Sequence, residues 1–122
     1  MSKVAPKTGA WYRIDMRIIA WRTLKNFVEG RARHKDQPAL KAAVDAWFGE
    51  VSRAEWASTA DVKRHYATAS TISADRIVFN IKGNSHRLVV AVDFEKAIVF
   101  VKWIGTQANY DKIDVRTVQD GD

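Results

Sequence analysis

The chain has 122 residues, a length that suits one domain of ordinary size. It has no cysteine, which excludes disulfides and thiolate metal sites, and no apolar run approaches the ~20 residues that cross a bilayer. The 20 Lys and Arg residues outnumber the 14 Asp and Glu residues, and the resulting formal charge of +6 favours polyanionic partners, chiefly nucleic acid.

The first 15 residues differ from the rest of the chain. They mix Pro6, Gly9 and small residues without a clean period, and they lack the apolar segment of a secretory signal peptide. We therefore expect a cytoplasmic protein, with residues 1–15 as a flexible N-terminal extension and residues 16–122 as a single domain. Met16 is an alternative start.

A short apolar run at residues 16–19 predicts a strand. Helical spacing begins at Ala20, and Gly30 is a plausible stop for this first helix. A polar loop follows. Asp36 and Pro38 indicate the start of a second helix, and its apolar stripe runs on to Ala54.

A short third helix is predicted because Ser58 and Asp61 have the spacing of a capping box. Residues 67–74 are rich in Ser, Thr and Ala, and we interpret them as a loop. The tail, residues 113–122, is polar and is expected to fray.

The second half of the body is rich in β-forming residues. Lys82-Gly83-Asn84 is a hairpin turn signal, and a further turn is expected at Glu95-Lys96. The predicted strands are residues 77–81, 88–92 and 98–103. They are nearly continuous in apolar residues, so both faces of the sheet should be covered at least in part. We predict an α+β fold with N-terminal helices packed on a small antiparallel β-sheet, to which residues 17–19 add a candidate edge strand.

Polar residues surround the first hairpin, and others follow the third strand. In a meander, the first turn and the end of the third strand lie on the same side, so the two groups should meet at one edge of the sheet. The groups are Asn80, Lys82, Asn84 and Arg87 at the hairpin, and Thr106, Gln107, Asn109, Tyr110, Asp111 and Lys112 after the strand.

Such a patch suits RNA cleavage without a metal. Arg87, Lys82 and Lys112 can stabilise the charge that develops on the phosphorane, while Tyr110 can transfer a proton or stack on a base. The plainer interpretation is that residues 82–84 form only a turn and that Tyr110 only packs.

The histidines and tryptophans add little to this picture. No two of the three histidines are spaced as a metal pair, so no metal or cofactor site is expected. Lys102 and Trp103 should point to opposite faces of their strand, which argues against a stacking surface of aromatic and basic residues there. Trp21, Trp47 and Trp103 lie within apolar patterns and are expected in the core.

The segment Val78-Phe79-Asn80-Ile81-Lys82-Gly83-Asn84-Ser85-His86-Arg87-Leu88 closely resembles the signature of HigB-type toxins, which read close to Val-Phe-Asn-Ile-x-Gly-Asn-x-Tyr-Arg-Leu. Residues 16–24, 46–56 and 105–114 look like that family's N-terminus, second helix and closing motif. The resemblance covers roughly residues 16–118. It implies a RelE-like fold and ribosome-dependent cleavage of mRNA. It also implies a helix-turn-helix antitoxin of the HigA type, and the toxin would bind operator DNA only through this antitoxin.

Several residues match family positions directly, and three depart from them. The family commonly has His where this chain has Gln107, Glu where it has Asn109, and often Tyr where it has His86. Glutamine cannot exchange a proton near neutral pH, so loss of a general acid or base there would cost about 10²–10⁴ in rate. A compensating proton-transfer role for His86 is a speculation. The matching residues are Asn80, Gly83, Asn84, Arg87, Thr106, Tyr110 and Asp111.

Three functions are therefore weighed. The first is the toxin of a type II toxin–antitoxin system, a metal-independent mRNA endonuclease that inhibits translation. Its catalytic residues would be Arg87, Gln107, Tyr110 and Lys82, and its RNA contacts Asn80, Asn84, Lys102, Asp111 and Lys112. The second is a catalytically weak or inactive homologue that binds RNA, ribosome and antitoxin. The third is a toxin with a different target such as DNA gyrase, because RelE-like folds include such toxins.

Overall fold

The computed structural model describes residues 15–119, so the predicted N-terminal extension lies outside the described residues except for Asp15. None of the helices in this part of the chain is long and apolar enough to span a membrane. The elements in chain order are β1 (Arg17–Ile19), α1 (Trp21–Gly30), α2 (Gln37–Ser52), α3 (Thr59–His65), β2 (Ser70–Thr71), β3 (Arg76–Ile81), β4 (His86–Asp93), β5 (Ile98–Thr106) and α4 (Gln107–Tyr110).

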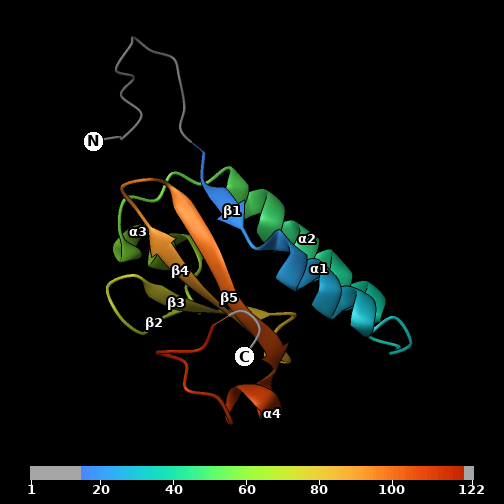
Figure 1. The fold of residues 1–122 in the computed structure, drawn as a ribbon. Coiled ribbons are helices and arrows are strands. Elements are labelled where there is room, and N and C mark those ends of the chain that lie inside the picture. The colour runs from blue at the N-terminus through green and yellow to red at the C-terminus, as the bar shows by residue number, and fades with distance from the viewer. Residues whose placement is uncertain (1–14, 120–122) are drawn as a thin grey trace.

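The five strands form one sheet in the order β1-β5-β4-β3-β2. The predicted meander is present, because β4 pairs antiparallel with both β3 and β5. The edge strand expected at residues 17–19 is β1, and it runs parallel to β5, so the sheet is mixed (Figure 1). The α+β class is confirmed. The short strand β2 lies in a segment that the sequence indicated as loop.

One main core joins the helices to the sheet. It contains Leu24 of α1, Leu40 and Val44 of α2, and strand residues such as Leu88 and Val99, all almost fully buried. Because α2 shows its buried residues at helical spacing, its apolar stripe could be read from the sequence. Figure 1 shows α1 and α2 side by side, with β1 next to them.

The opposite face of the sheet carries a smaller core. Val78, Val89 and Val118 are buried there, and Tyr110, Ile113 and Val115 pack against them. The prediction that the tail frays is therefore wrong for residues 113–118. Their apolar side chains are separated by polar ones, which hides the packing from a composition argument.

The buried guanidinium of Arg76 fixes this tail segment. Its Nη1 donates to the carbonyl oxygens of Val115 at 3.1 Å and Val118 at 2.8 Å. These two charge-assisted hydrogen bonds pair Nη1 with two backbone acceptors, so the contact holds the tail segment against β3. Residues 113–118 thus form a strap over the second sheet face, and we use that name for them below.

Candidate functional site

The hairpin between β3 and β4 brings the first group of polar residues together. Asn80 and Arg87 are paired across the two strands, and Asn80 Nδ2 donates to Asn84 Oδ1 at 3.5 Å. The turn requires left-handed backbone at Lys82 and Gly83, with φ of +56° and +64°. Glycine adopts this conformation without steric cost, which explains a glycine at position 83.

Arg87 is held against the backbone of this turn. Its Nη1 donates to the carbonyl oxygens of Asn84 at 3.0 Å and His86 at 3.1 Å. Both bonds use the same nitrogen, so Nη2 and Nε make no hydrogen bond to the described residues. The side chain is half-buried. Arg87 is therefore a positioned cation with donors left to bind a phosphate oxygen.

The end of β5 brings in the second group. Thr106 pairs with His86 across β4 and β5, and its Oγ1 accepts a hydrogen bond from the backbone N–H of Asn109, which caps α4. The backbone N–H of Gln107 donates to the Ser85 carbonyl at 3.1 Å. These bonds tie the start of α4 to the hairpin turn, so the two polar groups do meet at one end of the sheet.

Three strands contribute to one row at this end. Asn80, Arg87 and Gly105 are neighbours in register across β3, β4 and β5. Because side chains alternate along a strand, these residues share the face of Val78 and Val89, which belong to the smaller core. The candidate site therefore lies on the sheet face that carries the strap.

A β-bulge in β5 changes where two predicted residues point. Val89 pairs with Trp103 but Val90 pairs with Val101, so Lys102 is the extra residue. Val101 and Ile104 both face the main core, while Trp103 packs in the smaller one. The expectation that Lys102 and Trp103 point to opposite faces is therefore wrong.

Lys102 lies on this face but further along β5. Its Nζ is 5.6 Å from the centroid of the Phe100 ring and donates to Gln119 Oε1 at 3.1 Å. It precedes Gly105 by three residues, which is roughly 10 Å along a strand. The structure thus separates Lys102 from the row of Asn80 and Arg87.

The remaining predicted residues lie on or beside α4 and the turn. Gln107, Asp111 and Lys112 are exposed, and Tyr110 is half-buried with its ring centroid 6.2 Å from that of Trp103. Lys82 is half-buried, and no hydrogen bond joins its side chain to Arg87 within the described residues. The charge of Lys82 instead contributes to the electrostatics around His86.

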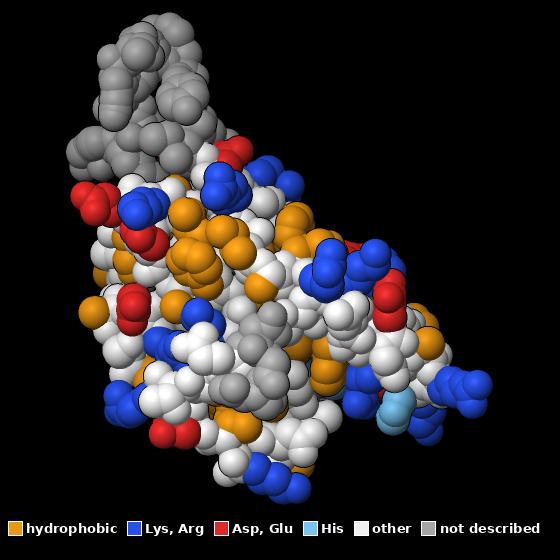
Figure 2. Space-filling view, viewed as in Figure 1, with side chains coloured by type: hydrophobic (Ala, Val, Ile, Leu, Met, Phe, Trp, Pro, Cys, Tyr) orange, Lys and Arg blue, Asp and Glu red, His pale blue; other side chains and the backbone are white. Residues whose placement is uncertain are grey.

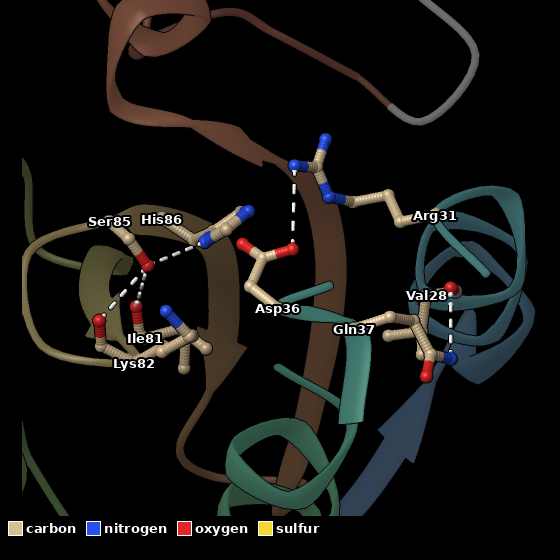
Figure 3. A network of polar contacts seen from close by, with 8 residues as sticks. All are labelled: Val28, Arg31, Asp36, Gln37, Ile81, Lys82, Ser85 and His86. Carbon is tan, nitrogen blue, oxygen red and sulfur yellow. Dashed lines mark hydrogen bonds and ion pairs between the residues drawn. The ribbon is translucent and has the colours of Figure 1, made fainter. Parts of the chain in front are cut away.

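His86 is buried, with 2% of its surface exposed, on the face opposite to Arg87. Its ring meets Phe27 of α1 edge-on at 5.7 Å. The Ser85 hydroxyl donates to the Lys82 carbonyl and is 2.7 Å from His86 Nδ1, so its oxygen is left to accept from Nδ1–H (Figure 3). This position does not suit the speculated transfer of a proton beside Arg87.

Charged residues of the α1–α2 connection also approach His86. Arg31 and Asp36 form an ion pair at 4.0 Å next to the imidazole (Figure 3). Burial, and secondly the positive charge of Arg31, lower the pKa of His86 below its ordinary value. The lowered pKa favours the neutral form of the imidazole.

Outside the site, burial and a hydrogen bond to Glu50 raise the pKa of Tyr66 above its ordinary value. This phenol packs against the main core and takes no part in the row of site residues. Among residues 15–119, no group of three or more His, Asp or Glu side chains is arranged to hold a metal ion.

Sequence reasoning missed two features of the site. The carbonyl oxygens of Asn84 and His86 orient Arg87, and backbone acceptors leave no mark in residue types. The proximity of Trp103 to the row depends on the bulge, which no local motif announces. The one sequence signal for the position of Trp103 is Gly105, a small residue two positions later.

Comparison with known proteins identifies the family of the chain. A family model described as the RelE-like toxic component of a toxin–antitoxin system matches residues 40–113, which include the hairpin, β4, β5 and α4. No curated protein gives a significant match. Since the match covers more than half of the chain, the protein belongs to the HigB toxin family.

Proposed function

We propose that this chain is the toxin of a type II toxin–antitoxin pair and that it acts in the cytoplasm as a ribosome-dependent, metal-independent mRNA endonuclease. The observation that carries the proposal is the anchoring of Arg87. Two backbone carbonyls hold Nη1 of its guanidinium, Nη2 and Nε make no hydrogen bond to the described residues, and Arg87 is paired in register with Asn80. A positioned guanidinium is suited to a phosphate that gains negative charge.

The chemistry requires three events. The 2′-hydroxyl of one nucleotide loses a proton and attacks its own 3′-phosphate, the phosphorane gains negative charge, and the 5′-oxygen leaves with a proton. Arg87 stabilises the phosphorane, Lys82 adds positive charge at the turn, and the Tyr110 phenol assists proton transfer. Asn80, Asn84, Asp111 and Lys112 contact the neighbouring nucleotides, and Lys102 contacts RNA further along β5.

The family also supplies the partners. A toxin of a toxin–antitoxin system has an antitoxin. We propose that this antitoxin is a helix-turn-helix protein of the HigA type and that operator DNA is reached only through it. The ribosomal A-site would hold the mRNA in the bent geometry that cleavage requires, so the toxin itself would not have to impose that geometry.

Substitution of Arg87 tests the proposal. Arg87→Ala should abolish growth arrest when the full chain is induced in bacteria, because loss of one charge-stabilising donor costs about 10²–10³ in rate. Arg22→Ala, which removes an exposed cation of α1, is the matched control and should arrest growth like the wild type. Full toxicity of Arg87→Ala, in a protein shown to be folded by circular dichroism, would contradict the assignment.

A second candidate function, a catalytically weak binding homologue, is favoured by one observation. Gln107 is exposed at the start of α4, beside the row, and its amide cannot take or give a proton near neutral pH. If this limits the reaction, Gln107→His should raise cleavage by about 10²-fold or more. The proposed function predicts a change below about tenfold. Cleavage rates of both proteins on the same translated transcript decide between the two.

A further inference from the structure

Trp103 makes an unusual contact with the backbone of its own strand. A Cβ atom built on Gly105 would lie 2.5 Å from Cη2 and 2.6 Å from Cζ2 of the Trp103 indole. Any side chain at position 105 would have to displace the indole, which covers the space that its Cβ atom would occupy. Gly105 is buried for the same reason.

The β-bulge explains why the indole lies there. Lys102 is the extra residue in β5, and the bulge re-aims Trp103 within the smaller core. Bulges of this kind often stand next to functional sites because they redirect one side chain. Here the redirected side chain extends toward the row in which Gly105 pairs with Arg87.

The neighbours of Trp103 complete a surface suited to RNA. Arg87 pairs with Gly105, the residue that the indole covers, and lies one strand away from it, about 4.8 Å in the direction of the hydrogen bonds. Tyr110 lies next to Trp103, with its ring inclined 49° to the indole. Trp103 itself is half-buried, so it is not enclosed in the smaller core. Trp21 is also half-buried, but its ring packs on Phe48, between α1 and α2.

We propose that Trp103 is a base-stacking residue that takes an unstacked nucleobase of single-stranded RNA, next to the phosphate held by Arg87. The inference rests on the proposed function, because it names what binds beside the same site. An indole stacks on any base through its π-face, so the contact fixes the position of a nucleotide and tolerates its sequence. Gly105 is required because a Cβ atom at that position would displace the indole.

Nuclear magnetic resonance tests the contact without cleavage. The full chain, labelled with nitrogen-15, is titrated with a 2′-O-methylated hexanucleotide, whose blocked 2′-oxygen cannot attack. We expect the indole N–H resonance of Trp103, assigned with Trp103→Phe, to shift and saturate. The indole resonances of Trp21 and the buried Trp47 should stay in place. A Trp103 resonance that does not move, whether or not other residues respond, overturns the proposal.

A double-mutant cycle then asks whether a base is the partner. Trp103→Leu and a hexanucleotide with one abasic position should each weaken binding by about tenfold when the abasic position is the stacked one. Together they should weaken it no further, because both remove the same contact. Losses that multiply at every abasic position would contradict stacking on Trp103.

Two further variants separate stacking from packing. Trp103→Phe keeps an aromatic face and should retain most of the affinity, whereas Gly105→Ala keeps the indole but displaces it and should lose affinity like Trp103→Leu. Thermal unfolding checks that each variant is folded. These experiments measure binding, so their outcome is independent of the cleavage test. Stacking on Trp103 can be confirmed even if the chain cuts no RNA, and it can be refuted even if Arg87 proves essential for cleavage.

Discussion

At the residue scale, a short turn positions Arg87, the cation that we propose acts in catalysis. The acceptors that hold it are the carbonyls of Asn84 and His86, so the orientation of the guanidinium depends on backbone geometry at the hairpin. That geometry depends in turn on the positive φ of Gly83. A side chain at position 83 would strain the turn and move the carbonyl of Asn84, and with it the cation.

His86 is a buried imidazole among charges from two elements. Arg31 and Asp36 approach it from the α1–α2 connection, and Lys82 approaches it from the turn. Its Nε2 has no hydrogen-bond partner among the described residues. A proton on His86 would be opposed by burial and by the charges of Arg31 and Lys82, and only in part favoured by Asp36.

This burial predicts a pH dependence of stability. The pKa of His86 in the folded chain lies below the 6.5 of the unfolded chain, so the unfolded state takes up a proton first as the pH falls. The free energy of unfolding should thus decrease as the pH falls below about 6.5, until the lower pKa of the folded state is passed. Urea unfolding at pH 7.5 and 5.5 measures the difference.

His86→Phe should reduce that difference, because it removes the titrating group while keeping a ring against Phe27. His34→Gln, at an exposed position in the α1–α2 connection, is the control and should leave the difference unchanged. An equal pH dependence in His86→Phe and the wild type would show that other groups cause it.

At the scale of elements, strong periodicity made the helices predictable. Segments with only weak local signals could not be predicted in the same way. The stripe of α2 and the turn at residues 82–84 follow from spacing and residue type. The strap could not be foreseen, because the carbonyls of residues 115 and 118 are held by Arg76, nearly 40 residues earlier. Long-range contacts of this kind leave no local pattern.

The candidate site follows the same division. The meeting of the hairpin with the end of β5 follows from the meander alone, and the register confirms that Arg87 and Gly105 are neighbours. The direction of Trp103 did not follow, because alternation along a strand fails at a bulge. The distance of Lys102 from Arg87 did not follow either, because the residue type that predicts an RNA contact does not give its place along β5.

At the scale of the whole molecule, the two faces of the sheet are covered by different parts of the chain. The main core, with α1 and α2, lies on one face. The strap lies on the other and covers Val78 and Val89, while Arg87 and the start of α4 lie at the end of the sheet. The site is thus built on a packed scaffold, which favours fixed positions for its charged groups.

The charge is also unevenly placed. Figure 2 shows Lys and Arg side chains gathered at the end of the molecule formed by the α1–α2 connection. The exposed residues there include Arg33 and Lys35. If the chain binds RNA as proposed, a basic end of this kind should accelerate association and make it sensitive to salt.

The most direct test of the central claim, that the chain is a ribosome-dependent nuclease, is primer extension after induction in a bacterial host. Two versions of one transcript are compared, one with its start codon and one without. The account predicts growth arrest and cuts that appear only in the translated version. Normal growth with both transcripts intact, while the protein is present and folded, would contradict it.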